Sequence, residues 1–450
     1  MTTTTAKLRG GIALAIFILV TSHTVFGANT TWIPGGDVTD VDNWFKSGNW
    51  NNGVPTSADT AFIIYHTSSG GSFTDSGSPP GPRIEATGAV ADTIRLNNAS
   101  LLRVLSGGDL TVGNFFSVGE QATFNNIGSY VYQSGGTVSA NALYLGGIFA
   151  SLPDIGIYNQ SGGTLSVPNG FFIGFNGSSK GVFNLSGGTA TANAGMVVGN
   201  GAAGSMATVV QDGGTLTTPY LQVFAVGGSS ATYTFNGGAL NLTGSTLFAN
   251  GSAFTVGNGT SAATLTLSDG GTHGFFDGLV IANNATLKGT GTENQGAVTI
   301  NNGGTLSPGL SPGTITVAAM MLSGASILSY ELGPHNPDGS AIVGGGTNDL
   351  TVVNGNLTLD GILNVTALDG FGAFGSGLAA TNVYRLFNYI GTLTDDGLTV
   401  GSMPVGTMGF IDTSVGGQVN LFVIPEPSFV FLVGLGGLLL WRRHNRTRRA

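Results

Sequence analysis

Short runs in which apolar and polar residues alternate fill the middle of the chain, and glycine-rich turns separate them. In "TLSV", for example, Leu165 and Val167 fall on one face of an extended strand, while Thr164 and Ser166 fall on the other. Period-two segments bounded by Gly, Ser, Asn and Asp are typical of β-strands joined by tight turns. The pattern therefore predicts an all-β protein.

One turn motif recurs along the chain with an almost constant spacing. It begins with Ser, Asp or Asn and continues with two glycines, as in "SGGTV" and "DGGTL". A repeat of about 26 residues has room for three short strands and their corners, which together make one coil of a parallel β-helix, or β-solenoid. The first glycines of these motifs are Gly107, Gly135, Gly162, Gly187, Gly213, Gly237, Gly270 and Gly303, separated by 28, 27, 25, 26, 24, 33 and 33 residues.

Two columns of apolar residues are expected to stack inside these coils, because a single coil cannot bury its apolar side alone. The first column lies four residues before each glycine pair and comprises Val131, Tyr158, Phe183, Val209 and Tyr233. The second begins segments such as "FSVG" and "FFIG" and comprises Phe116, Leu143, Phe171, Met196, Phe224 and Phe254. We predict β-solenoid repeats over residues 96–319.

The segments on either side of the repeats have a different character. Residues 29–95 contain Trp32, Trp44 and Trp50, and bulky aromatic side chains can cover the exposed first coil of a solenoid. An aromatic platform for sugars is the alternative interpretation of these tryptophans. Residues 320–423 keep the alternating pattern without the glycine turn, which predicts a C-terminal β region that finishes the solenoid or forms a small β cap.

Composition narrows the class further. The 450 residues include 77 glycines, yet 41% of the chain is hydrophobic, which excludes a disordered polar chain; no Gly-X-Y period indicates collagen. A glycine content this high disfavours a helical solenoid. The absence of cysteine excludes disulfides, thiolate chemistry and cysteine-based zinc sites.

The formal net charge of −9 is unevenly distributed. Apart from Lys7, Arg9 and the C-terminal cluster, the body of the chain has seven basic residues against 22 acidic ones. Nucleic acid is excluded as a partner, because phosphate binding needs clustered Lys and Arg. The C-terminal cluster consists of Arg442, Arg443, Arg446, Arg448 and Arg449.

The N-terminus has the order of features of an export signal. Lys7 and Arg9 precede the apolar stretch "GGIALAIFILV", and small residues follow near Gly27 and Ala28. A positive start, an apolar core and a small-residue cleavage site characterise secretory signal peptides. We predict a signal peptide over residues 1–28, with a signal helix and with cleavage near Gly27 or Ala28.

The C-terminus combines Pro425, Glu426 and Pro427 with an apolar run and the arginine cluster, in that order. The apolar run Phe429–Trp441 has 13 residues, about 20 Å as a helix, against a hydrocarbon core of about 30 Å. Arginines hold such a short span on the cytoplasmic side. We predict a transmembrane helix over 428–441 that is a weak or temporary anchor, preceded by a proline-stiffened segment open to a processing enzyme.

These features resemble the PEP-CTERM sorting signal of Gram-negative bacteria, over residues 424–450. The resemblance implies that Pro425, Glu426 and Pro427 are recognised by an exosortase, a membrane transpeptidase-like cysteine protease, and that the helix and tail are then removed. The repeats, together with "TLSPG" and "NDLTV", resemble autotransporter-associated β-strand repeats. Carriers of the sorting signal typically accompany exopolysaccharide production, which implies a destination in the cell envelope or extracellular matrix.

Parallel β-helices also include polysaccharide lyases and glycosidases, which need paired carboxylates. Asp212 and Asp269 both occupy the turn position before a glycine pair, where Asp commonly starts a turn. Ser186 and Asn236 flank Asp212 in that column, so no ladder of carboxylates is expected.

The histidines predict no metal site, because they lack ligand spacing. His66, His273 and His335 are far apart and are expected to be solvated loop residues, while His23 lies in the signal and His444 in the tail.

The sequence therefore predicts an exported structural or adhesion-type protein without a catalytic, cofactor or metal site. Its Thr-, Ser- and Asn-rich faces would contact exopolysaccharide or other cells, and its other partners would be an exosortase-type enzyme and the membrane. The alternative is a polysaccharide lyase or glycosidase on the same scaffold. An autotransporter passenger would need a C-terminal membrane β-barrel in place of the apolar run and arginines.

Overall fold

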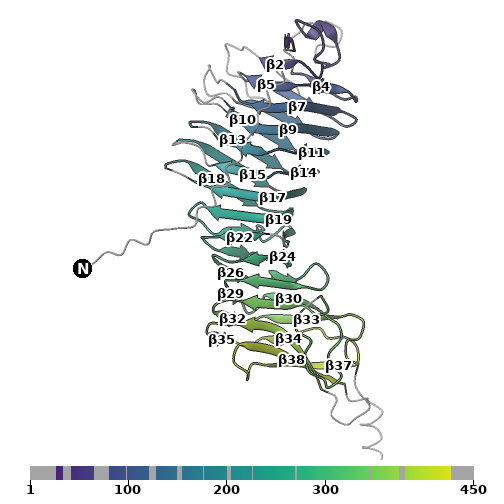
Figure 1. Cartoon of the computed structure of the whole chain (residues 1–450), viewed down its shortest axis with the longest axis vertical. Coiled ribbons are helices and arrows are strands. Elements are labelled where there is room, and N and C mark those ends of the chain that lie inside the picture. The colour runs from purple at the N-terminus through teal and green to yellow at the C-terminus, as the bar shows by residue number, and fades with distance from the viewer. Residues whose placement is uncertain are drawn as a thin grey trace, which may run out of the picture.

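Stacked parallel strands form one long β-helix in the computed structural model of the chain (Figure 1). The described residues form a 25-stranded and a 13-stranded sheet and one short 3-10 helix, η1 (Ser47–Asn49). The predicted all-β parallel β-solenoid is confirmed. The structure describes residues 27–33, 42–64, 81–97, 99–120, 128–148, 155–175, 177–199, 204–225, 227–268, 271–344, 346–373 and 381–426.

The 13-stranded sheet contains β3 (Arg83–Ile84), β6 (Leu101–Val104), β8 (Ser129–Gln133), β10 (Ile155–Gln160), β13 (Lys180–Leu185), β16 (Met206–Gln211), β18 (Ser230–Phe235), β20 (Phe254–Val256), β23 (Leu279–Ile281), β26 (Ala297–Ile300), β29 (Ala319–Leu322), β32 (Leu357–Leu359) and β35 (Leu393–Asp395).

The 25-stranded sheet contains β1 (Asn29–Thr31), β2 (Thr60–Ile64), β4 (Ala89–Ala91), β5 (Thr93–Asn97), β7 (Asp109–Val118), β9 (Thr137–Leu145), β11 (Thr164–Val167), β12 (Phe171–Ile173), β14 (Thr189–Ala192), β15 (Met196–Gly199), β17 (Thr215–Phe224), β19 (Gly238–Ala249), β21 (Ala263–Leu267), β22 (Thr272–Phe275), β24 (Ala285–Gly289), β25 (Thr292–Glu293), β27 (Thr305–Pro308), β28 (Thr314–Val317), β30 (Ile327–Leu332), β31 (Leu350–Val353), β33 (Ile362–Ala367), β34 (Asn382–Tyr389), β36 (Thr399–Val400), β37 (Thr407–Asp412) and β38 (Gln418–Pro425).

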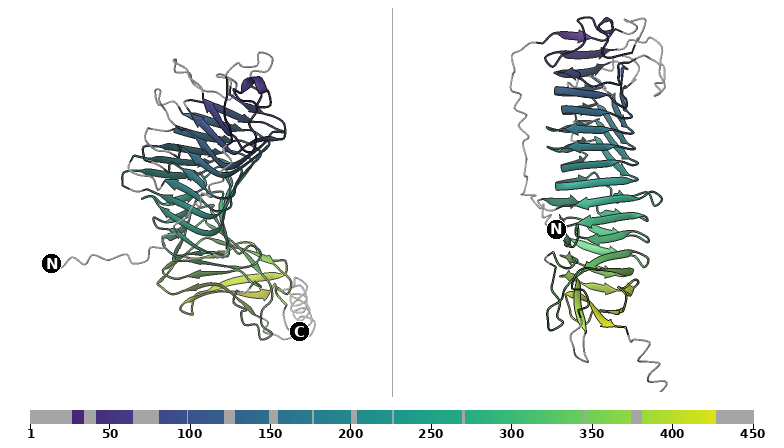
Figure 2. Two further views of the ribbon diagram at one scale, coloured as in Figure 1. Left: turned by 45° about the horizontal axis from the view of Figure 1, so that its top comes forward. Right: turned by 90° about the vertical axis from the view of Figure 1, so that its right-hand side faces the viewer.

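One coil consists of a strand of the 13-stranded sheet, the glycine turn, and two strand segments of the 25-stranded sheet that meet at a corner. β10, β11 and β12 form such a coil, and each pairs in parallel with its counterpart in the next coil, β13, β14 and β15. Figure 2 shows the resulting stack of strands along the molecule. The backbone N–H and C=O groups of each coil form hydrogen bonds with the coils on either side. Each coil is therefore stabilised by its neighbours.

The glycine pairs from Gly107 to Gly238 form corners that lie directly above one another. Their close stacking is seen at Gly163, whose carbonyl oxygen accepts a hydrogen bond from the Thr189 N–H of the next coil at 2.9 Å. A Cβ added to Gly188 would lie only 2.4 Å from that same Gly163 oxygen. The corner therefore requires glycine both for its backbone conformation and for the close approach of the next coil. The second glycines of five consecutive pairs have positive φ angles: 63° at Gly136, 71° at Gly163, 77° at Gly188, 65° at Gly214 and 88° at Gly238. The predicted column of glycine corners is wrong for the pair at 270–271, because Gly271 lies between β21 and β22 and packs against Gly244 and Ser245 at a different corner.

The first predicted apolar column is confirmed. Its members follow one another in register along the 13-stranded sheet and all are buried: Val131, Tyr158, Phe183, Val209 and Tyr233.

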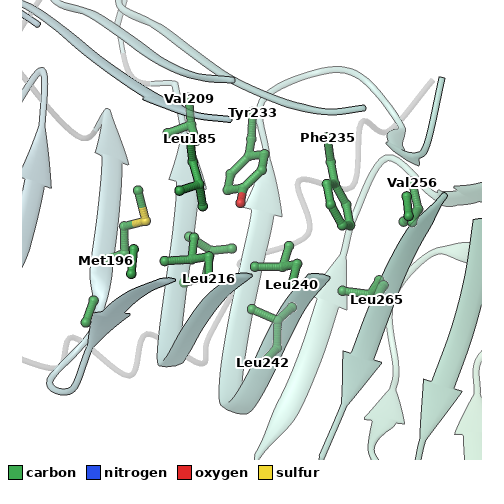
Figure 3. Close-up of a cluster of buried hydrophobic side chains, with 14 of the residues drawn as sticks. Leu185, Met196, Val209, Leu216, Tyr233, Phe235, Leu240, Leu242, Val256 and Leu265 are labelled. Atoms are coloured by element: carbon green, nitrogen blue, oxygen red, sulfur yellow. The ribbon is translucent and has the colours of Figure 1, made fainter. Parts of the chain in front are cut away.

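Leucines of the 25-stranded sheet face this column across the core. Leu216, Leu240 and Leu265 are register neighbours on β17, β19 and β21, and all three are fully buried. Figure 3 shows them on the opposite side of the core from Val209 and Tyr233. The solenoid is therefore a filled rod whose interior is one continuous apolar cluster.

The second predicted column is confirmed for its first four members and wrong for the last two. In the structure Met196 pairs with Leu221, not with Phe224, because the column follows the distance from the glycine turn and not the glycine that ends each segment. Phe254 lies in β20 of the other sheet, because the chain has already begun the next coil there, and Thr246 is the residue that pairs with Leu221. The four correct members, in register order, are Phe116, Leu143, Phe171 and Met196.

Buried glutamines just before the glycine turns cross-link neighbouring coils. The Oε1 atom of each can accept a hydrogen bond from a tyrosine hydroxyl of the following coil, as Gln133 does from Tyr158 at 2.8 Å and Gln211 does from Tyr233 at 2.7 Å. At the equivalent place beside Gln160 the chain has a phenylalanine, Phe183. The Oε1 atom of Gln160 is accordingly buried without a hydrogen-bond partner.

This orphaned acceptor predicts a stabilising substitution. Phe183→Tyr should supply the missing hydroxyl and raise the free energy of unfolding by about 1 kcal/mol, because a buried unpaired acceptor gains its partner. Tyr158→Phe is the matched control, which should lower the free energy of unfolding by about 1–2 kcal/mol by orphaning Gln133. Denaturant unfolding followed by circular dichroism measures both. A Phe183→Tyr variant less stable than the parent chain would show that the two sites are not equivalent.

The three tryptophans cover the N-terminal end of the core. Trp44 is fully buried, and Trp32 and Trp50 are each 3% exposed. Trp50 meets both of the others edge to face, with ring centroids 5.2 Å and 4.9 Å apart, and its Nε1–H donates to the Trp44 carbonyl at 2.8 Å. The alternative interpretation as a sugar platform is wrong, because no broad ring face is free to stack on a ligand.

Strand direction changes at the C-terminal end. The parallel coils continue past residue 319 through β28–β31, β31–β34 and β33–β36. β38 then pairs antiparallel with both β34 and β37. It occupies the place beside β34 that a further parallel coil would take, and so covers that open edge.

The predicted export and anchoring segments lie at the two ends of the chain. The predicted signal helix within residues 1–26 and the predicted transmembrane helix at 428–441 both lie outside the described residues. In the part of the chain that is described, no helix has the length and apolar character needed to cross a bilayer.

Candidate binding face

Two rows of small polar side chains run along the outer face of the 25-stranded sheet, immediately after the glycine turns. On each strand the valine, leucine or alanine between them faces the core, so the flanking Thr or Ser faces outward. We call the two rows together the hydroxyl ladder. One row comprises Thr137, Thr164, Thr189 and Thr215, and the other comprises Ser139, Ser166, Thr191, Thr217 and Asn241.

The hydroxyl ladder is regular because the coil is regular. Neighbours within a row are one coil apart, about 4.8 Å, and the two rows are two residues apart along the strand, about 6.6 Å. Some neighbours also bond to each other: Thr189 Oγ1 donates to Thr164 Oγ1 at 3.3 Å, and Asn241 Nδ2 donates to Thr217 Oγ1 at 3.3 Å. The ladder is uncharged, and its hydroxyls offer donors and acceptors at a fixed repeat.

A shorter polar row lies on the 13-stranded sheet. Asn159 and Asn184 are register neighbours there, and Asn184 Nδ2 donates to Asn159 Oδ1 at 2.8 Å. Tyr132 precedes them in the same row. The predicted Thr-, Ser- and Asn-rich outer faces therefore exist on more than one side of the rod, and the register assigns their members.

Asp212 has no carboxylate neighbour in its turn column among the described residues. Asp212 lies at a turn, and its Oδ1 accepts a hydrogen bond from Asn236 Nδ2 of the next coil at 2.7 Å. A glycosidase places two carboxyl groups on either side of the scissile bond, about 5–10 Å apart; the neighbour of Asp212 is an amide. Asp269 lies outside the described residues. The described residues also contain no cluster of acids and histidines that could hold a metal ion.

His273 is not the solvated loop residue that the sequence predicts. It is fully buried on β22, where its Nδ1 lies 3.0 Å from Thr246 Oγ1 and its Nε2 lies 3.2 Å from the Ser268 carbonyl oxygen. Burial lowers the pKa of His273, opposed by the hydrogen bond to Ser268. Both ring nitrogens are satisfied, so His273 is a neutral structural residue. His335 is half-buried near the C-terminal end, and His66 lies outside the described residues.

Three acids are buried among the described residues, and no sequence motif predicts them; Glu120 pairs with Arg95, whereas the other two bind backbone N–H groups. Asp349 is fully buried and accepts hydrogen bonds from the backbone N–H groups of Gly313 at 2.8 Å and Glu331 at 2.7 Å. Burial raises the pKa of Asp349 to about 7, against those two hydrogen bonds. Burial likewise raises the pKa of Glu293, which bonds backbone N–H groups at a corner. Each of these two carboxylates accepts hydrogen bonds from backbone N–H groups at a place where the coil is irregular. No sequence motif predicts this role.

The predicted sorting motif begins inside a sheet. Pro425 is the last residue of β38 and lies opposite Thr407 of β37, and the Glu426 N–H donates to the Gly406 carbonyl at 2.9 Å. Both residues are exposed. The segment is thus extended, as predicted, but its first two residues are held by β37. Pro427 and Arg442, Arg443, Arg446, Arg448 and Arg449 lie outside the described residues.

The predicted cleavage site near Gly27 and Ala28 lies at the start of β1. The Ala28 N–H donates to Asp59 Oδ1 at 2.9 Å, and the Thr60 N–H donates to the Ala28 carbonyl at 3.3 Å. Residues from Ala28 onwards are therefore already part of the first coil.

Comparison with known proteins finds a partial match to a bacterial adhesin. No protein-family model matches the chain. Over 120 residues, 26% of this chain, the sequence is 48% identical to a protein described as "Adhesin BmaC autotransporter" from Brucella suis biovar 1 (strain 1330). The matched part makes up only 3% of the length of that adhesin. Part of this chain is thus similar to a small part of an adhesin.

Proposed function

We propose that the protein is an exported structural or adhesion-type protein of the cell envelope or extracellular matrix, and that its hydroxyl ladder contacts neutral polysaccharide. The observation that carries this proposal is the uncharged double row of hydroxyls, repeated at the coil spacing along a rigid rod. A repeating polymer can bond to many equivalent positions of such a row at once, so that weak contacts add up to firm attachment. The partial similarity to an adhesin supports the same role.

We further propose that the C-terminus is a PEP-CTERM signal that an exosortase-type enzyme reads, so that the membrane helix is a transient anchor. The order of proline-rich motif, apolar run and arginines supports this proposal. Mass spectrometry of the protein from its native host tests it. A mature chain that ends near Pro425 is expected, and a chain that retains Arg449 would refute processing.

Polymer contact is tested by removing hydroxyls without changing side-chain shape. Thr164, Thr189 and Thr215 would be changed together to valine, and adhesion of the purified protein to a surface coated with the host's exopolysaccharide would be measured. Because the valines keep the volume of threonine but cannot bond to sugar hydroxyls, we expect at least tenfold weaker adhesion.

The matched control changes three outward threonines of the 13-stranded sheet, Thr208, Thr299 and Thr358, to valine. This control should adhere like the parent chain. Equal adhesion by both triple variants, with unchanged thermal unfolding midpoints, would show that the ladder is not the contact surface.

A further inference from the structure

The 13-stranded sheet is interrupted between β18 and β20. On one side, β18 pairs with β16 through six residues, whereas on the other side only Phe235 pairs, with Val256 of β20. Val256 of β20 pairs with Phe235 only 21 residues after it, whereas Phe235 follows its own partner Gln211 by 24 residues. Residues 250–253 take an irregular path where a strand would otherwise lie. The edge of β18 is consequently left open along residues 231–234.

A cavity of about 520 Å³ lies at this opening. Hydroxyl and carboxamide groups line its mouth, among them Thr232, Thr234 and Asn250, and the aromatic rings of Tyr233 and Phe254 lie beneath them. None of the described residues that line it carries a charge. Its volume lies within the range of small-molecule sites, about 300–1,000 Å³.

Unpaired backbone groups add to the polar character of the cavity. In β18 the carbonyl of Phe235 accepts from Gly257 N–H at 2.8 Å, so every second residue, including Ala231 and Tyr233, directs its backbone groups to the open side. The Ala231 carbonyl accepts from Asn250 Nδ2 at 3.0 Å, while Asn250 Oδ1 is buried without a hydrogen-bond partner. No strand among the described residues pairs with Tyr233 on this side.

We propose that this cavity binds a neutral sugar residue. Ring hydroxyls of a sugar can donate to and accept from the threonine hydroxyls, Asn250 and the backbone of Tyr233. The lack of charge in the cavity lining leaves no partner for a uronate or phosphate. The inference rests on the proposed carbohydrate-contacting function and adds a discrete site to the extended ladder.

An added peptide strand fits the site less well. Strand addition needs a row of free backbone groups along several residues. Here the Asn250 side chain already occupies the Ala231 carbonyl, so the open edge offers only the backbone groups of Tyr233. Such a short stretch suits a compact ligand with hydroxyls pointing in several directions.

Calorimetric titration of the purified protein with glucose, galactose, mannose and N-acetylglucosamine tests the proposal. At least one sugar should bind saturably at one site per chain. Thr232→Val should weaken that binding at least fivefold, and Ser252→Trp, which places an indole at the mouth from an exposed position, should abolish it. Thr208→Val is the matched control, because Thr208 is the register neighbour of Thr232 one coil earlier and lies outside the cavity.

The outcomes separate this inference from the proposed function. Absence of saturable sugar binding, or a Ser252→Trp variant that binds like the parent chain, overturns the cavity assignment even if the ladder variant loses adhesion. Binding of a Thr-Val pentapeptide that Ser252→Trp blocks, without sugar binding, would assign the site to an added strand. Sugar binding that Ser252→Trp abolishes, with normal adhesion of the ladder variant, would leave the cavity assigned and refute the ladder.

Discussion

Gly188→Ala should destabilise the β-helix by about 3 kcal/mol or more. The added Cβ meets two obstacles at once: a backbone at φ 77° and the Gly163 carbonyl oxygen at 2.4 Å. That oxygen is the acceptor for Thr189 N–H, so moving it away weakens a hydrogen bond that joins adjacent coils. Thermal and denaturant unfolding followed by circular dichroism should show a lower midpoint than that of the parent chain.

Gly259→Ala separates the two causes. Gly259 has a similar φ of 82°, but an added Cβ there meets nothing within 4 Å. The Gly259→Ala substitution should therefore lower the free energy of unfolding only by the backbone strain, about 1 kcal/mol. If both variants lost the same stability, the stacked corners would have room for a methyl group, and the glycine pairs would be needed for their turn conformation alone.

Much of the fold follows from local sequence, because each coil repeats the same physical problem. The glycine pairs mark the corners, and the residue four positions earlier faces the core in every coil from Val131 to Tyr233. The alternation after the turn also predicted that Thr164 and Ser166 face outward, and both belong to the hydroxyl ladder. Periodic features of this kind can be recognised in a single sequence because the sequence contains several copies of them.

What the sequence could not reveal depends on contacts between coils. Leu221 takes the place expected of Phe224 because the pairing of β17 with β15 follows the distance from the glycine turn. His273 and Asp349 are buried through irregularities of the coil, and no spacing rule identifies a buried polar residue whose partners are backbone groups. The cavity beside β18 left no trace in the glycine spacing, because the 33-residue interval that begins at Gly237 ends beside Gly271, which lies between β21 and β22 and not at the corner that follows the 13-stranded sheet.

The same regularity connects the fold to the proposed role. A solenoid has no folded interior into which a polymer could enter, so recognition is confined to its outer faces and to breaks in its sheets. The hydroxyl ladder is the first kind of surface and the cavity beside Tyr233 is the second. In the proposed role, repetition along the rod provides affinity for a polymer, and the break provides selectivity for one sugar.

Trp44→Ala should have the other large effect, a loss of about 3–5 kcal/mol for the coils near the N-terminus. Trp44 is fully buried, packs edge to face on Trp50 with ring centroids 4.9 Å apart, and joins the cap to the first coils through its backbone N–H, which donates to the Arg83 carbonyl at 3.1 Å. Removing the indole leaves a cavity that the surrounding strands cannot close.

The loss should be local, because each coil of a solenoid contacts only its neighbours. Hydrogen exchange should therefore accelerate in β2 and β5, beside the cap, while β13 and β16 in the middle of the rod keep their protection. Trp44→Phe, which keeps an aromatic ring in the same place, should show a smaller change in the same strands. Faster exchange spread evenly over the rod would mean that the coils unfold as one unit, and unchanged exchange in β2 would mean that the tryptophans do not stabilise the end of the solenoid.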